Sequence, residues 1–137
     1  MIHIVDYGAG NLFSVKNALD YLHIENKITA NPADLAEADG IILPGVGAFR
    51  DAMTMLNGSG FTEEIKKQAA AGKPLLGICL GMQMLFEKGY EFGESDGLGL
   101  IPGCVQLIDG GGLNPALAKY KKYNEKYMKK LERKFWS

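Results

Sequence analysis

Short apolar runs alternate with amphipathic stretches along the first hundred residues of the chain. Short runs of this kind predict β-strands over residues 2–5, 24–29, 40–43 and 74–78, and the last run leads straight into Cys79. The second run is more polar, as expected of a strand near the edge of a sheet. The fourth run offers no polar face, which is typical of a strand in the middle of a parallel sheet. A fifth strand is expected over residues 104–108.

Between these strands, apolar residues recur with the period of an amphipathic helix. Helices are expected over residues 11–23, 49–56 and 61–71 and from Leu80 to about Lys88, and Asn31-Pro32 opens a short one. Strands that alternate with helices require a parallel sheet with right-handed crossovers. The pattern therefore predicts an α/β fold, a flavodoxin-like doubly wound five-stranded parallel sheet of order 2-1-3-4-5, with helices on both faces.

The last segment of the chain has a different pattern. Residues 110–112 are three glycines, which we interpret as a joint, and Asn114-Pro115 then offers a helix N-cap and first turn. The apolar stripe that follows predicts an amphipathic helix over residues 113–136 that covers a sheet face and completes a single domain over residues 1–137. Its members are Leu117, Tyr120, Tyr127, Met128, Leu131 and Phe135.

Charge is distributed unevenly, although the net charge of the 137 residues is only −1. Residues 1–113 hold seven Lys/Arg and fourteen Asp/Glu, whereas residues 114–137 hold eight and two. A basic tail can bind nucleic acid or an acidic membrane surface, but helical spacing favours a solvated lysine-rich face. We expect neither a nucleic-acid nor a membrane partner, and no apolar run reaches the length of a membrane span.

The cysteines and histidines limit the possible chemistry. Cys79 and Cys104 are too few for a disulfide framework and lack zinc-ligand spacing, which favours a reducing cytoplasm. His3 and His23 are the only histidines, so we expect no metal site. We also expect no cofactor.

The sharpest motif is Gly77-Ile78-Cys79-Leu80-Gly81-Met82-Gln83. A buried strand meets a helix at Cys79, with glycines two residues before and two residues after it. This is the pattern of a nucleophile elbow, in which a tight turn lifts the central side chain out of the sheet. The backbone N–H of Leu80 would then face the developing charge of an acyl oxygen. The alternative interpretation is an inert cysteine at a strand end.

Four segments together resemble one family. Besides the Cys79 motif, they are Asp6-Tyr7-Gly8-Ala9-Gly10-Asn11, Pro44-Gly45-Val46-Gly47-Ala48-Phe49 and Gly97-Leu98-Gly99-Leu100-Ile101-Pro102-Gly103. In this order they resemble the class I glutamine amidotransferases, in particular the glutaminase subunit of imidazole glycerol phosphate synthase, over residues 1–109.

The resemblance implies a catalytic centre. Cys79 would attack the side-chain amide of glutamine, form a thioester and release ammonia. The backbone amides of Val46 or Gly47 and of Leu80 would form the oxyanion hole. The remaining substrate-binding residues would be Gln83, Gly45 and Gly81. In the family the ammonia passes to a (βα)₈ cyclase partner.

The chain also departs from this family. The family places its general base and orienting acid in a C-terminal His-x-Glu, and this chain has no histidine after Asp109. Loss of the base costs several orders of magnitude in rate, so we expect little turnover. Residues 110–137 do not match the family pattern, which indicates an engineered or chimeric chain.

Three functions remain open from the sequence. The first is a folded scaffold without native activity, which we favour. The second is a glutaminase completed by another chain. The third is a phosphate- or flavin-binding module that uses the loop Asp6–Asn11, although this loop lacks the longer dinucleotide fingerprint.

Overall fold

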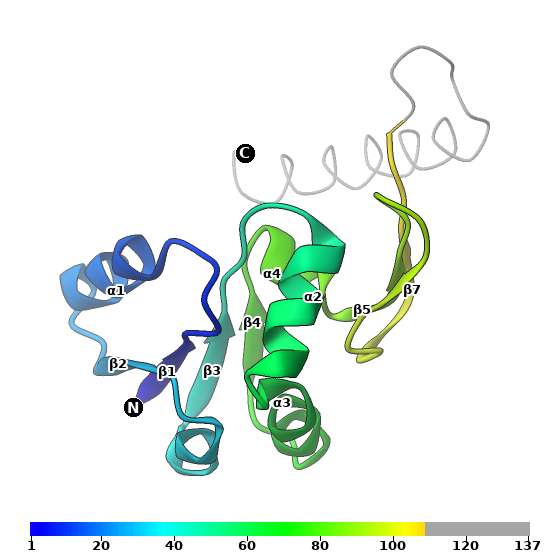
Figure 1. Ribbon diagram of the computed structural model, residues 1–137. Coiled ribbons are helices and arrows are strands. Elements are labelled where there is room, and N and C mark those ends of the chain that lie inside the picture. Colours follow the sequence, from blue (N-terminus) through cyan, green and yellow to red (C-terminus); the bar gives the residue numbers. More distant parts are fainter. Residues whose placement is uncertain (109–137) are drawn as a thin grey trace, which may run out of the picture. The chain divides into compact units, whose positions relative to one another are not determined.

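A computed structural model describes residues 1–108 of the chain (Figure 1). The glycine joint predicted at residues 110–112 and the helix predicted over residues 113–136 lie outside the described residues. Residues 1–106 form one compact unit. None of the helices within residues 1–108 has the length and apolar character that crossing a membrane requires.

The main sheet has four parallel strands in the order β2-β1-β3-β4. These strands are β1 (Ile2–Val5), β2 (Asn26–Thr29), β3 (Gly40–Leu43) and β4 (Leu75–Gly77). The connecting helices are α1 (Leu12–Tyr21), the 3₁₀ helix η1 (Pro32–Glu37), α2 (Phe49–Gly58) and α3 (Phe61–Ala70), and α4 (Leu80–Gln83) follows β4. The α/β class with a parallel sheet is therefore confirmed.

The prediction of a five-stranded sheet of order 2-1-3-4-5 is wrong. The last described strand, β7 (Ile101–Val105), lies in a separate three-stranded sheet of order β6-β5-β7, with β5 (Phe86–Gly89) and β6 (Ser95–Asp96). Among residues 1–108, β4 is thus an edge strand of the main sheet rather than a central one. The side chain of Leu76 is accordingly 56% exposed.

The helix predicted from Leu80 to about Lys88 is also shorter, because it ends at Gln83. The carbonyl of Met84 accepts a hydrogen bond from the N–H of Leu98 at 2.8 Å, and that of Leu85 accepts one from Leu100 at 2.8 Å. These carbonyls are therefore paired with a distant loop instead of the next helical turn. This pairing starts the second sheet.

The hydrophobic core lies on one face of the main sheet. Val5, Ile41 and Leu43 point to this face, where η1, α2 and α3 cover them. On α2 the buried residues Phe49, Ala52, Met53 and Leu56 follow the helical period, so one stripe of the helix packs inward. Burying a side chain such as Phe49 stabilises the fold by about 1.5–3 kcal/mol.

Helix α1 covers the opposite face. The crossover through α1 moves from β1 to β2, whereas that through α2 and α3 moves the other way along the sheet, from β3 to β4. Right-handed crossovers in opposite directions place their helices on opposite faces. The side chain of Asn11 caps α1 by accepting a hydrogen bond from the N–H of Ser14 at 3.3 Å. No residue of α1 is fully buried.

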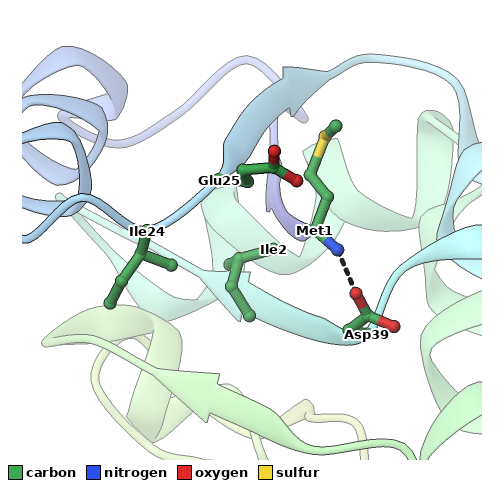
Figure 2. Close-up of a pocket in the computed structure, with 5 residues that line it drawn as sticks. All are labelled: Met1, Ile2, Ile24, Glu25 and Asp39. Atoms are coloured by element: carbon green, nitrogen blue, oxygen red, sulfur yellow. Dashed lines mark hydrogen bonds and ion pairs between the residues drawn. The ribbon is translucent and has the colours of Figure 1, made fainter.

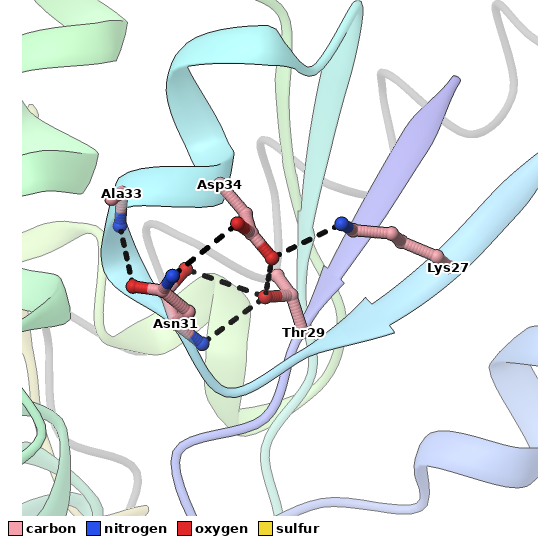
Figure 3. A network of polar contacts seen from close by, with 5 residues as sticks. All are labelled: Lys27, Thr29, Asn31, Ala33 and Asp34. Carbon is pink, nitrogen blue, oxygen red and sulfur yellow. Dashed lines mark hydrogen bonds and ion pairs between the residues drawn. The ribbon is translucent and has the colours of Figure 1, made fainter.

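A polar network fixes the turn from β2 into η1 (Figure 3). The hydroxyl of Thr29 donates to a carboxylate oxygen of Asp34 at 2.7 Å, and the ammonium of Lys27 lies 3.1 Å from the same oxygen. The side chain of Asn31 caps η1 by accepting from the N–H of Ala33 at 3.2 Å. The bond from Thr29, reinforced by Lys27, lowers the pKa of Asp34.

His3 lies on β1 beside this network. It pairs in register with Lys27 on one side and Ile41 on the other, and its side chain is 3% exposed. Its Nδ1 has no hydrogen-bond partner. Burial, followed by the nearby Lys27 cation, lowers the pKa of His3 below its ordinary value of 6.5. The folded protein therefore favours the neutral ring.

Helix α4 packs directly against the end of β3. The carbonyl of Leu43 accepts a hydrogen bond from the N–H of Ile78 at 3.0 Å, just before the helix. A Cβ on Gly81 would fall on that carbonyl oxygen, and a Cβ on Gly77 would lie 2.6 Å from the Cα of Met82. Both positions therefore require glycine because backbone meets backbone there.

This packing predicts the effect of adding one methyl group. Gly81→Ala should lower the free energy of unfolding by about 1–3 kcal/mol, because the new Cβ displaces α4 from β3. Gly58→Ala is the matched control, since a Cβ there meets nothing within 4 Å, and it should leave stability unchanged or raise it slightly. Urea unfolding measures both. Equal effects of the two substitutions would contradict the close approach.

The buried His3 predicts a pH-dependent stability. The unfolded chain takes up a proton on this ring near pH 6.5, and the folded chain does so only at lower pH. The contribution of His3 to stability is therefore complete above pH 6.5 and is lost as the pH falls from 6.5 through the folded pKa. Unfolding free energies measured from about pH 8 to about pH 5 should show this decline. His3→Gln should flatten the decline, whereas His23→Gln should leave it in place.

Candidate active site

Cys79 occupies the junction between β4 and α4. Its backbone angles, φ 54° and ψ −120°, lie in a region that side-chain-bearing residues rarely adopt. Within residues 1–108, His23 is the one other non-glycine residue with a positive φ. Such strain persists only where the surroundings impose it, and it is concentrated at functional sites. The turn leaves Cys79 exposed.

The surroundings that impose this turn are glycines. Gly77 and Gly81 bring α4 against β3, as described above, and the N–H groups of Met82 and Gln83 both point back to the carbonyl of Cys79, at 3.0 and 3.3 Å. The carbonyl of Cys79 is therefore hydrogen-bonded into the first turn of α4. Leu80 is buried, Gly81 is buried, and Gln83 is half-buried at the end of this helix.

The loop after β3 lies against this turn. Gly45 is buried, and a Cβ on it would lie 2.6 Å from the backbone nitrogen of Gly81 and 3.0 Å from the Cβ of Leu80. Beyond Gly45 the loop rises into solvent: Val46 is 56% exposed, and Gly47 has a φ of 90°. The structure thus brings together the two segments that the sequence suggested for an oxyanion hole.

Two residues that the sequence analysis did not single out support this loop. The hydroxyl of Tyr7 donates to the carbonyl of Pro44 at 2.8 Å. A carboxylate oxygen of Glu91 accepts from the N–H of Phe49 at 3.2 Å, and so supplies the cap that α2 lacks from its own N-cap residue, Ala48. Tyr7 lies within one of the matched segments, but Glu91 comes from a glycine-rich stretch without a spacing signal.

The chain has two histidines, His3 and His23, and both fall within residues 1–108. His3 is buried within β1, and His23 follows the end of α1. No hydrogen bond in the described part of the chain joins either ring to Cys79. The described residues also contain no group of three His, Cys, Asp or Glu side chains placed to hold a metal ion.

A shallow pocket of about 220 Å³ lies elsewhere (Figure 2). It is lined by Met1, Ile2, Ile24, Glu25 and Asp39, and the terminal ammonium of Met1 forms an ion pair with Asp39. These residues stand at the amino ends of the parallel strands, whereas Cys79 follows the carboxyl end of β4. Sites in open α/β sheets lie at the carboxyl ends, so this pocket is not the candidate active site.

A family model and curated relatives both match this chain to glutamine amidotransferases. CobB/CobQ-like glutamine amidotransferase domains match residues 2–110. The imidazole glycerol phosphate synthase subunit HisH of Lacticaseibacillus casei is 58% identical over 108 residues, which are 79% of this chain and 52% of that protein. The chain thus spans about half the length of this curated relative. A crystal structure of a glutamine amidotransferase superimposes with a TM-score of 0.68 at 24% identity, over 82% of this chain and 60% of that one.

Another relative changes the interpretation of the C-terminal segment. The HisH subunit of Desulfitobacterium hafniense is 49% identical over 132 residues, which are 96% of this chain and 63% of that protein. This alignment leaves five of the 137 residues outside, so it continues well past residue 109. The prediction that residues 110–137 do not match is therefore wrong for this relative, and the comparisons lend no support to an engineered or chimeric origin. The family match spans far more than half of the length of this chain, so the chain belongs to the glutamine amidotransferase family.

Proposed function

We propose that this chain supplies the nucleophile and the oxyanion hole of a glutaminase that releases ammonia for histidine biosynthesis. The observation that carries the proposal is the strained backbone of Cys79 at a strand–helix junction. Beside it lies the loop after β3, residues 44–48, which we call the glycine loop and whose Val46 is exposed. The identity of 58% to a HisH subunit supports glutamine as the substrate. The favoured alternative from the sequence, an inactive scaffold, has no comparable support.

In this proposal Cys79 attacks the side-chain amide carbon of glutamine. The carbonyl oxygen gains negative charge, which the N–H groups of Leu80 and of Val46 or Gly47 stabilise. The C–N bond then breaks, ammonia leaves with a proton from a general acid, and a thioester remains on the sulfur. Water hydrolyses this thioester to glutamate and restores the thiol.

The substrate would lie over the first turn of α4. Cys79 directly precedes this helix, and Gln83, which is half-buried, ends it. Gly45 and Gly81 leave the backbone of the loop and of the helix in direct contact, so no side chain intrudes between them. These three residues are proposed to hold the glutamine.

In this proposal the general base comes from residues other than His3 and His23, since His3 is buried within β1 and no hydrogen bond of residues 1–108 joins either ring to Cys79. Curated relatives are about twice as long as the matched part of this chain. Strand β4 has a neighbour on one side only in the described structure, and Leu76 is exposed on it. We propose that further polypeptide completes the site along this edge and supplies the base, and that a (βα)₈ cyclase receives the ammonia.

Complementation tests this function. The chain is mixed with a polypeptide that corresponds to the rest of the Lacticaseibacillus casei relative, and glutamate release from glutamine is followed. The mixture should turn over several orders of magnitude faster than the chain alone, because a nucleophile without its base retains little activity. Binding of the two polypeptides is verified separately by sedimentation.

Two cysteine variants make this test specific. Cys79→Ser should abolish the turnover of the mixture, whereas Cys104→Ser, the matched control, should retain it, since Cys104 lies in β7 of the second sheet. A bound mixture that releases no glutamate would refute the glutaminase. Steady turnover by the chain alone would refute an external base.

A further inference from the structure

Tyr7 connects the loop after β1 to both halves of the candidate site. Its side chain is 4% exposed, and its hydroxyl lies 2.8 Å from the carbonyl oxygen of Pro44 and 3.6 Å from the sulfur of Met84, which follows α4. The single hydroxyl hydrogen goes to the carbonyl, which is the closer and stronger acceptor. One buried group therefore contacts both the start of the glycine loop and the end of α4.

The hydroxyl of Tyr7 remains a hydrogen-bond donor at neutral pH. Burial raises the pKa of Tyr7 to about 12, so the hydroxyl keeps its proton throughout the neutral range. Pro44 is buried as well, and removing its donor would leave a carbonyl in apolar surroundings without a partner. Breaking this hydrogen bond would therefore cost free energy, and the bond holds the carbonyl of Pro44 in one direction.

The glycine loop is held at its base and free at its tip. A Cβ on Gly10 would lie 3.2 Å from the ring of Pro44, and Gly45 is closed in by Gly81 and by the Tyr7 hydroxyl. By contrast, a Cβ on Gly47 would meet nothing within 4 Å, and Val46 is exposed. Because a peptide unit is planar, fixing the Pro44 carbonyl also fixes the orientation of the Gly45 N–H. It thereby fixes the point from which the chain leads to the amides of Val46 and Gly47.

From this geometry we infer that Tyr7 is a positioning residue, which aims the backbone amides of Val46 and Gly47 at the acyl oxygen by holding the carbonyl of Pro44. This role rests on the proposed function of the loop as part of an oxyanion hole. In this scheme Tyr7 touches neither the sulfur of Cys79 nor the substrate. It acts through the loop.

Two thiol reagents separate positioning from simple structural support. p-Nitrophenyl acetate acylates Cys79 through a tetrahedral oxyanion: the sulfur attacks the ester carbon, the C–O bond breaks and p-nitrophenolate leaves. Iodoacetamide alkylates the same sulfur by displacing iodide and forms no oxyanion. In a Cys104→Ser background, Tyr7→Phe should slow acylation about tenfold and leave alkylation unchanged, because only acylation uses the amides of the loop.

Two further variants serve as controls. Tyr21→Phe, a matched change at an exposed tyrosine on α1, should alter neither rate, and Cys79→Ser should react with neither reagent at this position. An unchanged acylation rate in Tyr7→Phe, or an equal fall in both rates, would overturn the inference. Glutamine is absent from this assay, so its result is independent of whether complementation yields a glutaminase.

A measurement on the unmodified chain covers the case in which Tyr7→Phe does not fold. A buried, hydrogen-bonded hydroxyl proton exchanges slowly with water and should give its own NMR signal, with cross-peaks to the amide of Gly45 and the methyl group of Met84. A Tyr7 hydroxyl proton that exchanges freely, or that lacks the Gly45 cross-peak, would refute the role.

Discussion

The site depends on one contact between backbones, at the point where α4 packs against the end of β3. A Cβ on Gly81 would fall on the Leu43 carbonyl, and one on Gly45 would press on the Gly81 nitrogen. Only glycine allows these segments to approach so closely, and the approach forces Cys79 into its unusual backbone conformation. The position of the sulfur is therefore set by main-chain packing rather than by side-chain contacts around it.

Local sequence patterns predicted the parts of the fold that depend on neighbouring residues. The strands at residues 2–5 and 40–43 and the glycines around Cys79 followed from apolar runs and turn chemistry. The errors concern long-range pairing. The apolar run before Cys79 does not tell a central strand from an edge strand, and β7 joins a second sheet because distant amides take the carbonyls of Met84 and Leu85. Tyr7 and Glu91 were missed for the same reason, since their partners lie about forty residues away.

The proposed function divides catalysis between residues of this chain and residues supplied by further polypeptide. In that proposal the nucleophile and the amide donors come from two segments of one compact unit, which pack against each other in the absence of substrate. Proton transfer in this proposal requires an imidazole or an equivalent group, and His3 is a buried member of β1 whose neutral form the fold favours. A preformed cradle for charge and a separately supplied base would make ammonia release conditional on assembly.

The glycine packing also has a consequence for how relatives are recognised. Gly45, Gly77 and Gly81 are demanded by the way the chain is folded, whether or not any glutamine is ever cleaved. A descendant that lost its enzymatic role would keep these three positions for as long as it kept its shape. These three glycines therefore indicate common descent. Active enzymes are distinguished from inactive relatives by the proton-transfer residues that accompany the cysteine.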